Sequence, residues 1–304
     1  MSRAKLTGLG LIPVLCAMVA TAGPAGAAAP KPSIAITAQS ASSVHARGGS
    51  VTFTGNVANA SSCVLTSKPA TTTVTTSCNH LPSFTAPVNA TAKAITYKVT
   101  ITATGSGKAA ATATVVQEAA VVVEMWGDSL MYQDGPFVQE AIEAANPNVI
   151  TYIHAFPATD ICFWNDASRS DGIPKMLKAH KPSVVILQMR GEGAAKCAKK
   201  GDPNAGDYSA KGLAQVTTSY EAVVAELVKA KVAYGEVVSL PVRRTTGTQG
   251  SDDVNMRNAI ATAVSVVGGA SVHYLDPSPS LTGPDGAYTD TLPCTAEELA
   301  TPGH

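Results

Sequence analysis

A serine suited to nucleophilic chemistry follows an apolar run near the middle of the chain. Ser129 comes after Gly127 and Asp128, directly behind residues 119–126, which are apolar apart from Glu124. A serine between a strand and a helix can project its hydroxyl into a crevice, where backbone N–H groups stabilise an oxyanion. The structural alternative is that Asp128 or Ser129 only caps the helix. We favour the nucleophile.

The elements around this serine alternate between strand and helix. The β-like runs are 149–156, 183–189, 233–240 and 271–275, and the helix-compatible stretches are 136–145, 172–179, 213–230 and 252–266. Apolar strands alternating with amphipathic helices predict a parallel sheet covered on both faces, a three-layer flavodoxin-like arrangement of the α/β class. Ligands of such sheets bind beyond the carboxyl ends of the strands, where Ser129 stands.

From about residue 121 to the C-terminus the chain resembles the SGNH/GDSL hydrolases, in particular exported actinobacterial members with cysteines around the site. The segment Gly127-Asp128-Ser129-Leu130 carries the resemblance, and residues 155–162 look like the second block of the family. The resemblance implies that Ser129 is the nucleophile and that the N–H groups of Ser129 and Ala158 form the oxyanion hole. Ala158 stands where the family usually has glycine, and alanine retains the N–H.

Residues 187–192 look like the third block, but Glu192 stands where the family has an oxyanion-hole asparagine. An ionised carboxylate only accepts hydrogen bonds and would repel the developing negative charge. Loss of one such donor costs about 100- to 1000-fold in rate. An ordinary loop carboxylate, a redirected substrate preference and a lost activity all remain open for this position.

The resemblance also implies an Asp-x-x-His pair after the last strand, with histidine as the general base. Downstream of Asp276 the sequence has a single histidine, His304, and Thr301 stands at the acid position. We expect a truncated C-terminus; a diverged or inactive enzyme, or His304 as the working base, are the alternatives.

The cysteine count also fits a truncated C-terminus. Of six cysteines, Cys16 falls in the expected signal peptide, residues 1–27. Five cysteines remain, which cannot all form disulfides with one another in an oxidising compartment. Cys63 and Cys78 sit in adjacent expected strands and should pair. Among Cys162, Cys197 and Cys294 we prefer the pair Cys162 with Cys197, because both follow strands at one end of the sheet.

The other histidines after residue 118 are expected to have structural roles. His154 and His273 fall within expected strands, and His180 ends a basic helix whose C-terminal dipole it would complement. The chain has no recognisable zinc spacing and no complete phosphate loop. We therefore expect neither a metal nor a cofactor.

The N-terminus has the order of a secretory signal peptide over residues 1–27, with Arg3 and Lys5 before an apolar stretch and small residues. No other segment is apolar for long enough to predict a transmembrane helix. Lys plus Arg and Asp plus Glu are both 22, which disfavours a nucleic-acid partner. A secreted or cell-surface protein is expected.

Residues 31–117 are rich in Thr, Ser, Val and Ala, with alternating runs such as 50–54, 72–76 and 97–102. Short alternating strands at this spacing predict an immunoglobulin-like sandwich. Few aromatic residues are present to stack on sugars. A spacer or general adhesion module, for instance toward a cell-wall polymer, is favoured over a specific binding module.

Together these features predict an exported serine hydrolase, with residues 118–304 as its hydrolase domain. It would cleave or transfer an acyl or acetyl ester of lipid or carbohydrate through an acyl-enzyme on Ser129. The alternative is a non-catalytic cell-surface binding protein that keeps the same scaffold.

Overall fold

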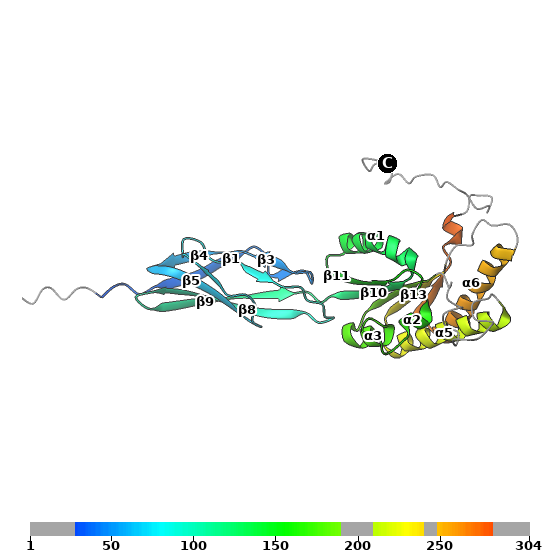
Figure 1. Ribbon diagram of the computed structural model, residues 1–304. Helices are drawn as coiled ribbons and strands as arrows, with labels where there is room; N and C mark the ends of the chain where they lie inside the picture. The colour runs from blue at the N-terminus through cyan, green and yellow to red at the C-terminus, as the bar shows by residue number, and fades with distance from the viewer. Residues whose placement is uncertain (1–27, 190–208, 240–247, 282–304) are drawn as a thin grey trace, which may run out of the picture.

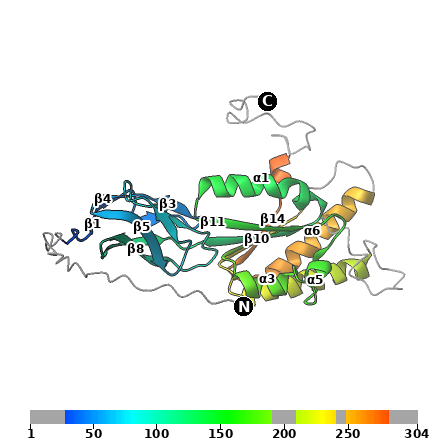
Figure 2. The same ribbon diagram turned by 60° about the vertical axis from the view of Figure 1, so that its left-hand side comes forward.

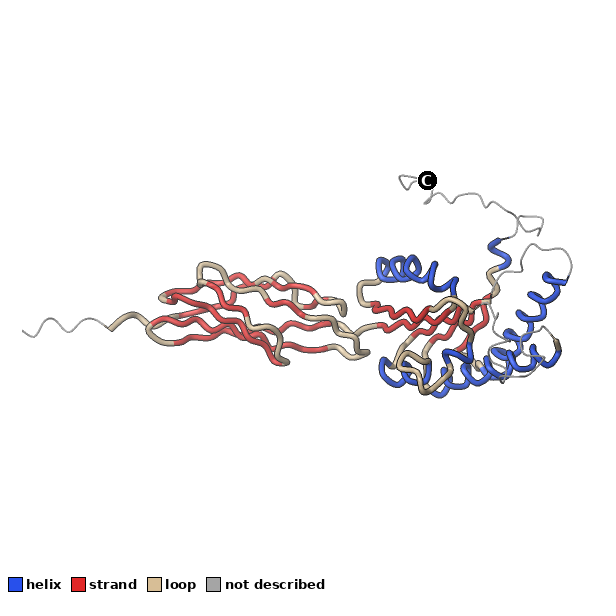
Figure 3. The backbone as a smooth tube through the Cα atoms, viewed as in Figure 1, coloured by secondary structure: helices blue, strands red, loops and turns tan. Residues whose placement is uncertain are grey.

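The computed structural model describes residues 28–189, 209–239 and 248–281. An all-β part comes first in the chain and is followed by a part that mixes strands and helices (Figure 1). The described helices all belong to the second part (Figure 3). The predicted α/β class is confirmed, since the chain combines helices with several sheets.

The all-β part is built from short strands that share one core. Its strands are β1 (Ser33–Gln39), β2 (Ser43–Val44), β3 (Gly49–Val51), β4 (Phe53–Ala58), β5 (Ala60–Lys68), β6 (Val74–Thr76), β7 (Phe84–Ala86), β8 (Ile95–Gly105) and β9 (Lys108–Gln117). One sheet has the order β2-β9-β8-β5-β6, while β1 pairs with β4 and β3 with β7. Buried side chains such as Phe53, Leu65 and Phe84 join the three sheets because alternate residues of each strand point inward.

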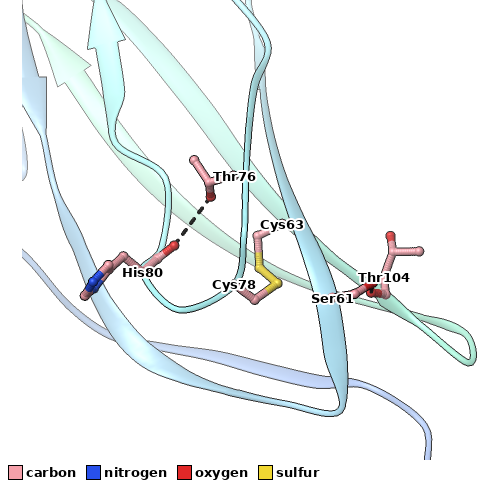
Figure 4. The surroundings of a disulfide bond; sticks show 6 residues. All are labelled: Ser61, Cys63, Thr76, Cys78, His80 and Thr104. Carbon is pink, nitrogen blue, oxygen red and sulfur yellow. Dashed lines mark hydrogen bonds between the residues drawn. A yellow bond between two sulfur atoms is a disulfide. The ribbon is translucent and has the colours of Figure 1, made fainter.

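A disulfide joins Cys63 to Cys78, as the sequence predicted (Figure 4). Cys63 lies in β5 and is fully buried, but Cys78 follows β6 instead of lying in a strand. The alternating pattern could not show where β6 lies. Residues 72–76 alternate throughout, but only Val74, Thr75 and Thr76 pair with β5.

Replacing both Cys63 and Cys78 with alanine should lower the free energy of unfolding of the β part by about 3 kcal/mol, because a crosslink over a loop of this length restricts the unfolded chain. The sequence separation of the two cysteines is 15. Urea denaturation followed by circular dichroism measures the change, and the unreduced wild type is the reference. A loss below about 1 kcal/mol would contradict the expectation.

The second part contains a five-stranded parallel sheet. Its strands are β10 (Val121–Gly127), β11 (Val149–Ala155), β12 (Val184–Gln188), β13 (Tyr234–Val238) and β14 (Val272–Leu275), in the spatial order β11-β10-β12-β13-β14. All four pairings are parallel. The inner strand β10 is buried on both faces, which explains why its sequence is apolar almost throughout.

Helices cover the two faces of this sheet unequally. α1 (Ser129–Ala145) lies on one face of the sheet (Figure 2). On that face, Val123 and Met125 of β10 pack with Met131. The other face packs against α2 (Ile161–Trp164), α3 (Ile173–His180), α5 (Ala210–Lys229) and α6 (Thr248–Val267), and the short 3₁₀ turn η1 (Ser278–Leu281) follows β14. Of the described helices, α1 alone lies on its face. Leu275, which shares that face in β14, is 43% exposed.

The β part contacts the amino ends of the parallel strands. The Ala46 N–H donates to Asn148 Oδ1 at 2.8 Å, just before β11, and the Arg47 guanidinium lies 3.0 Å from Glu143 of α1. The Ala120 N–H, just before β10, donates to the carbonyl of Thr91 at 2.8 Å. The β part therefore leaves the opposite, carboxyl ends of the strands uncovered.

Candidate functional site

Ser129 is the first residue of α1 and follows the carboxyl end of the inner strand β10. The buried Asp128 is the N-cap, and its side chain accepts a hydrogen bond from the Leu130 N–H at 2.9 Å. Glycine is required at 127, since an added Cβ would lie 2.0 Å from Met131 Cβ and 2.6 Å from the Gln188 carbonyl oxygen. The capping role thus falls to Asp128, and Ser129 stays half-buried at the helix N-terminus.

The helix begins earlier than the sequence suggested. The helix expected from the sequence covered residues 136–145. In the structure Pro136 lies inside α1, and the Asp128 cap begins the helix at Ser129. The first turn of α1 thereby directs backbone N–H groups toward the space around Ser129.

The turn at 156–159 is held against the residues that precede Ser129. The Gly127 carbonyl accepts from the Phe156 N–H at 3.3 Å and lies 3.3 Å from Thr159 Oγ1. The same hydroxyl lies 2.7 Å from the Phe156 carbonyl and accepts from the Trp164 indole N–H at 3.0 Å. This network brings Ala158 to the carboxyl end of β10.

Ala158 has a left-handed backbone with φ of 59°. Side chains with a Cβ rarely adopt this conformation, and glycine adopts it without a steric penalty. The backbone angle at position 158 therefore does not suit the Cβ of alanine. The turn is strained at the residue that would supply the second oxyanion-hole N–H.

Ala158→Gly should raise the free energy of unfolding by about 0.5–1 kcal/mol, because relief of left-handed strain outweighs the added freedom of the unfolded chain. Thermal unfolding measures the change. The matched variant Ala155→Gly, in the extended strand β11, should instead destabilise the protein. Equal destabilisation by both variants would argue against strain at Ala158.

A cavity of about 590 Å³ lies beside Ala158 and is lined by residues of the turn and of α2, with Asp166 and Arg169. A second cavity of about 310 Å³ shares Phe156, Phe163 and Arg169 with it. Volumes of this size accommodate small organic ligands. Under the turn lies the buried Tyr220 of α5, whose pKa is raised by burial and by the nearby carboxylates of Asp128 and Asp160.

A cluster of one glutamate and two histidines, which the sequence did not predict, lies within the second part of the chain. Glu124, in the middle of β10, is fully buried. One of its carboxylate oxygens lies 2.6 Å from Nε2 of His154, and the other contacts Nδ1 of His180. The two imidazoles stack on Trp126 and Tyr152, respectively. His180 ends α3 as expected, but its ring binds Glu124, a role that the dipole argument did not suggest.

Several residues singled out from the sequence lie outside the described part of the chain: Glu192, Cys197, Cys294 and His304. Cys162 is described and is disulfide-bonded. Over the described ranges, no group of three or more His, Cys, Asp or Glu side chains is arranged to hold a metal ion. Nor does any helix in those ranges have the length and apolar character needed to cross a membrane.

No model of a known protein family matches the chain, and no curated protein matches it significantly. Among solved structures, it is similar to a protein of Slackia heliotrinireducens assigned to the SGNH hydrolases, with 14% identity and a TM-score of 0.37 over 56% of this chain and 90% of the other. It is also similar to a carbohydrate acetylesterase from Xanthomonas citri, with 11% identity and a TM-score of 0.40 over 82% of this chain and 69% of the other. Because these values are low, the chemistry has to be inferred from the site itself.

Proposed function

We propose that this chain is an exported serine hydrolase of SGNH/GDSL type that cleaves, or transfers, an acyl or acetyl ester of a lipid or carbohydrate. The observation that carries the proposal is the position of Ser129, at the N-terminus of α1 and the carboxyl end of the inner strand β10. In parallel sheets of this strand order, ligands bind at that edge, beside the point between β10 and β12 where the strand order reverses.

The reaction follows from the groups around Ser129. Its Oγ attacks the ester carbonyl carbon, and negative charge develops on the carbonyl oxygen. The N–H groups of Ser129 and Ala158, together with the helix dipole, stabilise that oxygen. The alcohol leaves, and water then releases the acid from the acyl-enzyme. The proton of Ser129 needs a general base, for which His304 is the sequence-based candidate.

The chain layout extends the proposal. Residues 1–27 would be removed as a signal peptide, residues 31–117 would form an immunoglobulin-like spacer, and residues 118–304 the hydrolase domain. Contacts of the β part at the amino ends of the strands support this layout, since they leave the edge with Ser129 uncovered by that part. A secreted or cell-surface location, with a cell-wall polymer as a partner of the spacer, completes the proposal.

The alternative is a non-catalytic cell-surface binding protein. The Ser129 hydroxyl makes no hydrogen bond to any residue in the described ranges, and the candidate base His304 lies outside those ranges. An active serine usually lies within hydrogen-bonding reach of its base, although this geometry often tightens only when substrate binds. Direct labelling of the serine separates the two functions.

A fluorophosphonate probe tests the proposal, because only an activated serine displaces the fluoride. Peptide mass spectrometry of the labelled full-length protein should locate the phosphonyl group on Ser129. Denatured protein, in which the site is dismantled, is the control and should remain unlabelled. An unlabelled native protein, or an adduct on a different serine, would refute the role of Ser129 and favour the binding protein.

A further inference from the structure

The cavity beside Ala158 has an exposed aromatic surface. Phe156, the first residue of the turn at 156–159, is 60% exposed, although it is large and apolar. Phe163 of α2 lines the same cavity. The exposed Phe156 ring, whose backbone N–H bonds the Gly127 carbonyl, offers a flat surface on which the apolar face of a ligand can stack.

Arg169 is fixed at the wall of this cavity. Its guanidinium carbon lies 3.8 Å from the centre of the Phe163 ring, and its Nη2 lies 2.8 Å from the Asp171 carboxylate. The Nε atom is buried and hydrogen-bonds to no residue within the described ranges. Arg169 is thus held in one position by the aromatic ring and the carboxylate, with donor capacity left over.

The charges around the cavity select the class of ligand. Among the described residues that line the two adjoining cavities, Asp160, Asp166 and Asp171 carry negative charge and Arg169 carries positive charge. Hydrogen bonds from Ser168 lower the pKa of Asp166, which keeps that carboxylate ionised. These carboxylates would repel a negatively charged ligand. A ligand with an aliphatic chain would remove the charged side chains from water without replacing their hydrogen bonds.

We propose that this cavity holds the sugar of a neutral acylated carbohydrate, which rests on the proposed function and names the leaving group. The ring of the sugar stacks on Phe156, and its hydroxyls bind Asp166 and Arg169. The bond from the sugar oxygen to the acyl carbon breaks as the bond to Ser129 Oγ forms. The serine proton passes through the base to the sugar oxygen, and water later releases the carboxylic acid.

The proposal is tested with two esters that share an acetyl group, a mono-O-acetylated methyl glucoside and ethyl acetate. Binding energy from the sugar should raise kcat/KM for the glucoside above that for ethyl acetate. Phe156→Ala should lower the glucoside value about five- to tenfold, and reduce the ethyl acetate value much less. Phe137→Ala, at a phenylalanine of α1 that is 74% exposed and does not line the cavity, is the matched control and should change neither.

A second variant tests the charge argument. Wild-type protein should use the acetylated glucoside in preference to an acetylated glucuronate. Asp166→Asn keeps the shape of the side chain and removes its charge, so this preference should narrow. A preference that is absent in the wild type, or unchanged in Asp166→Asn, would overturn the assigned role of Asp166.

Calorimetric titration with methyl glucoside separates this inference from the proposed function. Glucoside binding that is lost in Phe156→Ala, without turnover of either ester, would preserve the sugar site and refute the hydrolase. Ethyl acetate turnover with no glucoside binding and no preference for the sugar ester would preserve the hydrolase and refute the sugar site. Equal effects of Phe156→Ala on both esters would also refute the sugar site.

Discussion

Ser129→Ala is expected to lower kcat for ester hydrolysis by about 10⁴- to 10⁶-fold, the range seen when serine hydrolases lose a member of the nucleophile–base pair. The reason is that α1 begins at this residue and no other described serine follows the carboxyl end of β10. Alanine leaves both oxyanion N–H groups in place. The residual rate then reports stabilisation of the oxyanion without the covalent step.

The matched control is Ser265→Ala, at an exposed serine of α6 whose hydroxyl bonds the carbonyl of Thr262. Steady-state release of acetate should be unchanged in this variant. Thermal unfolding of both variants should stay near the wild type, since neither serine is buried. If Ser129→Ala kept more than about a tenth of the wild-type kcat, another group would have to be the nucleophile.

Local patterns carried most of the fold. The apolar runs that predicted strands at 149–156 and 183–189 correspond to β11 and β12, because the strands of a parallel sheet that helices cover are largely apolar. The placement of Ser129 after a strand also follows from adjacent residues alone. Features of this kind depend on neighbours in the sequence, so a single chain is enough to predict them.

The features that were missed depend on contacts between distant segments. Glu124 interrupts an apolar strand, and that interruption was the available signal, but its partners His154 and His180 lie in other elements. The positive φ of Ala158 arises because the turn is tied to Gly127, which no propensity of alanine would suggest. The early start of α1 depends on a cap that outweighs the usual position of proline.

The second large effect is expected from Glu124→Ala, which should lower the free energy of unfolding by about 3–5 kcal/mol. Glu124 is fully buried, and its two carboxylate oxygens contact one imidazole each. Its removal leaves two partly buried imidazoles without their partner and a void in β10. Both consequences are costly inside a sheet covered by helices.

Glu140→Ala is the matched control, because Glu140 is exposed on α1 and should cost less than about 0.5 kcal/mol. Glu124→Gln keeps the shape and one acceptor oxygen, but its amide N–H₂ faces an imidazole N–H. The free energy of unfolding of Glu124→Gln should therefore fall between those of the wild type and Glu124→Ala.

Urea denaturation monitored by tryptophan fluorescence is a suitable measurement, since Trp126 stacks on His154 at a centroid distance of 5.2 Å. A loss below about 1 kcal/mol for Glu124→Ala would mean that water or rearranged neighbours satisfy the histidines, and the cluster would then be unnecessary for the fold.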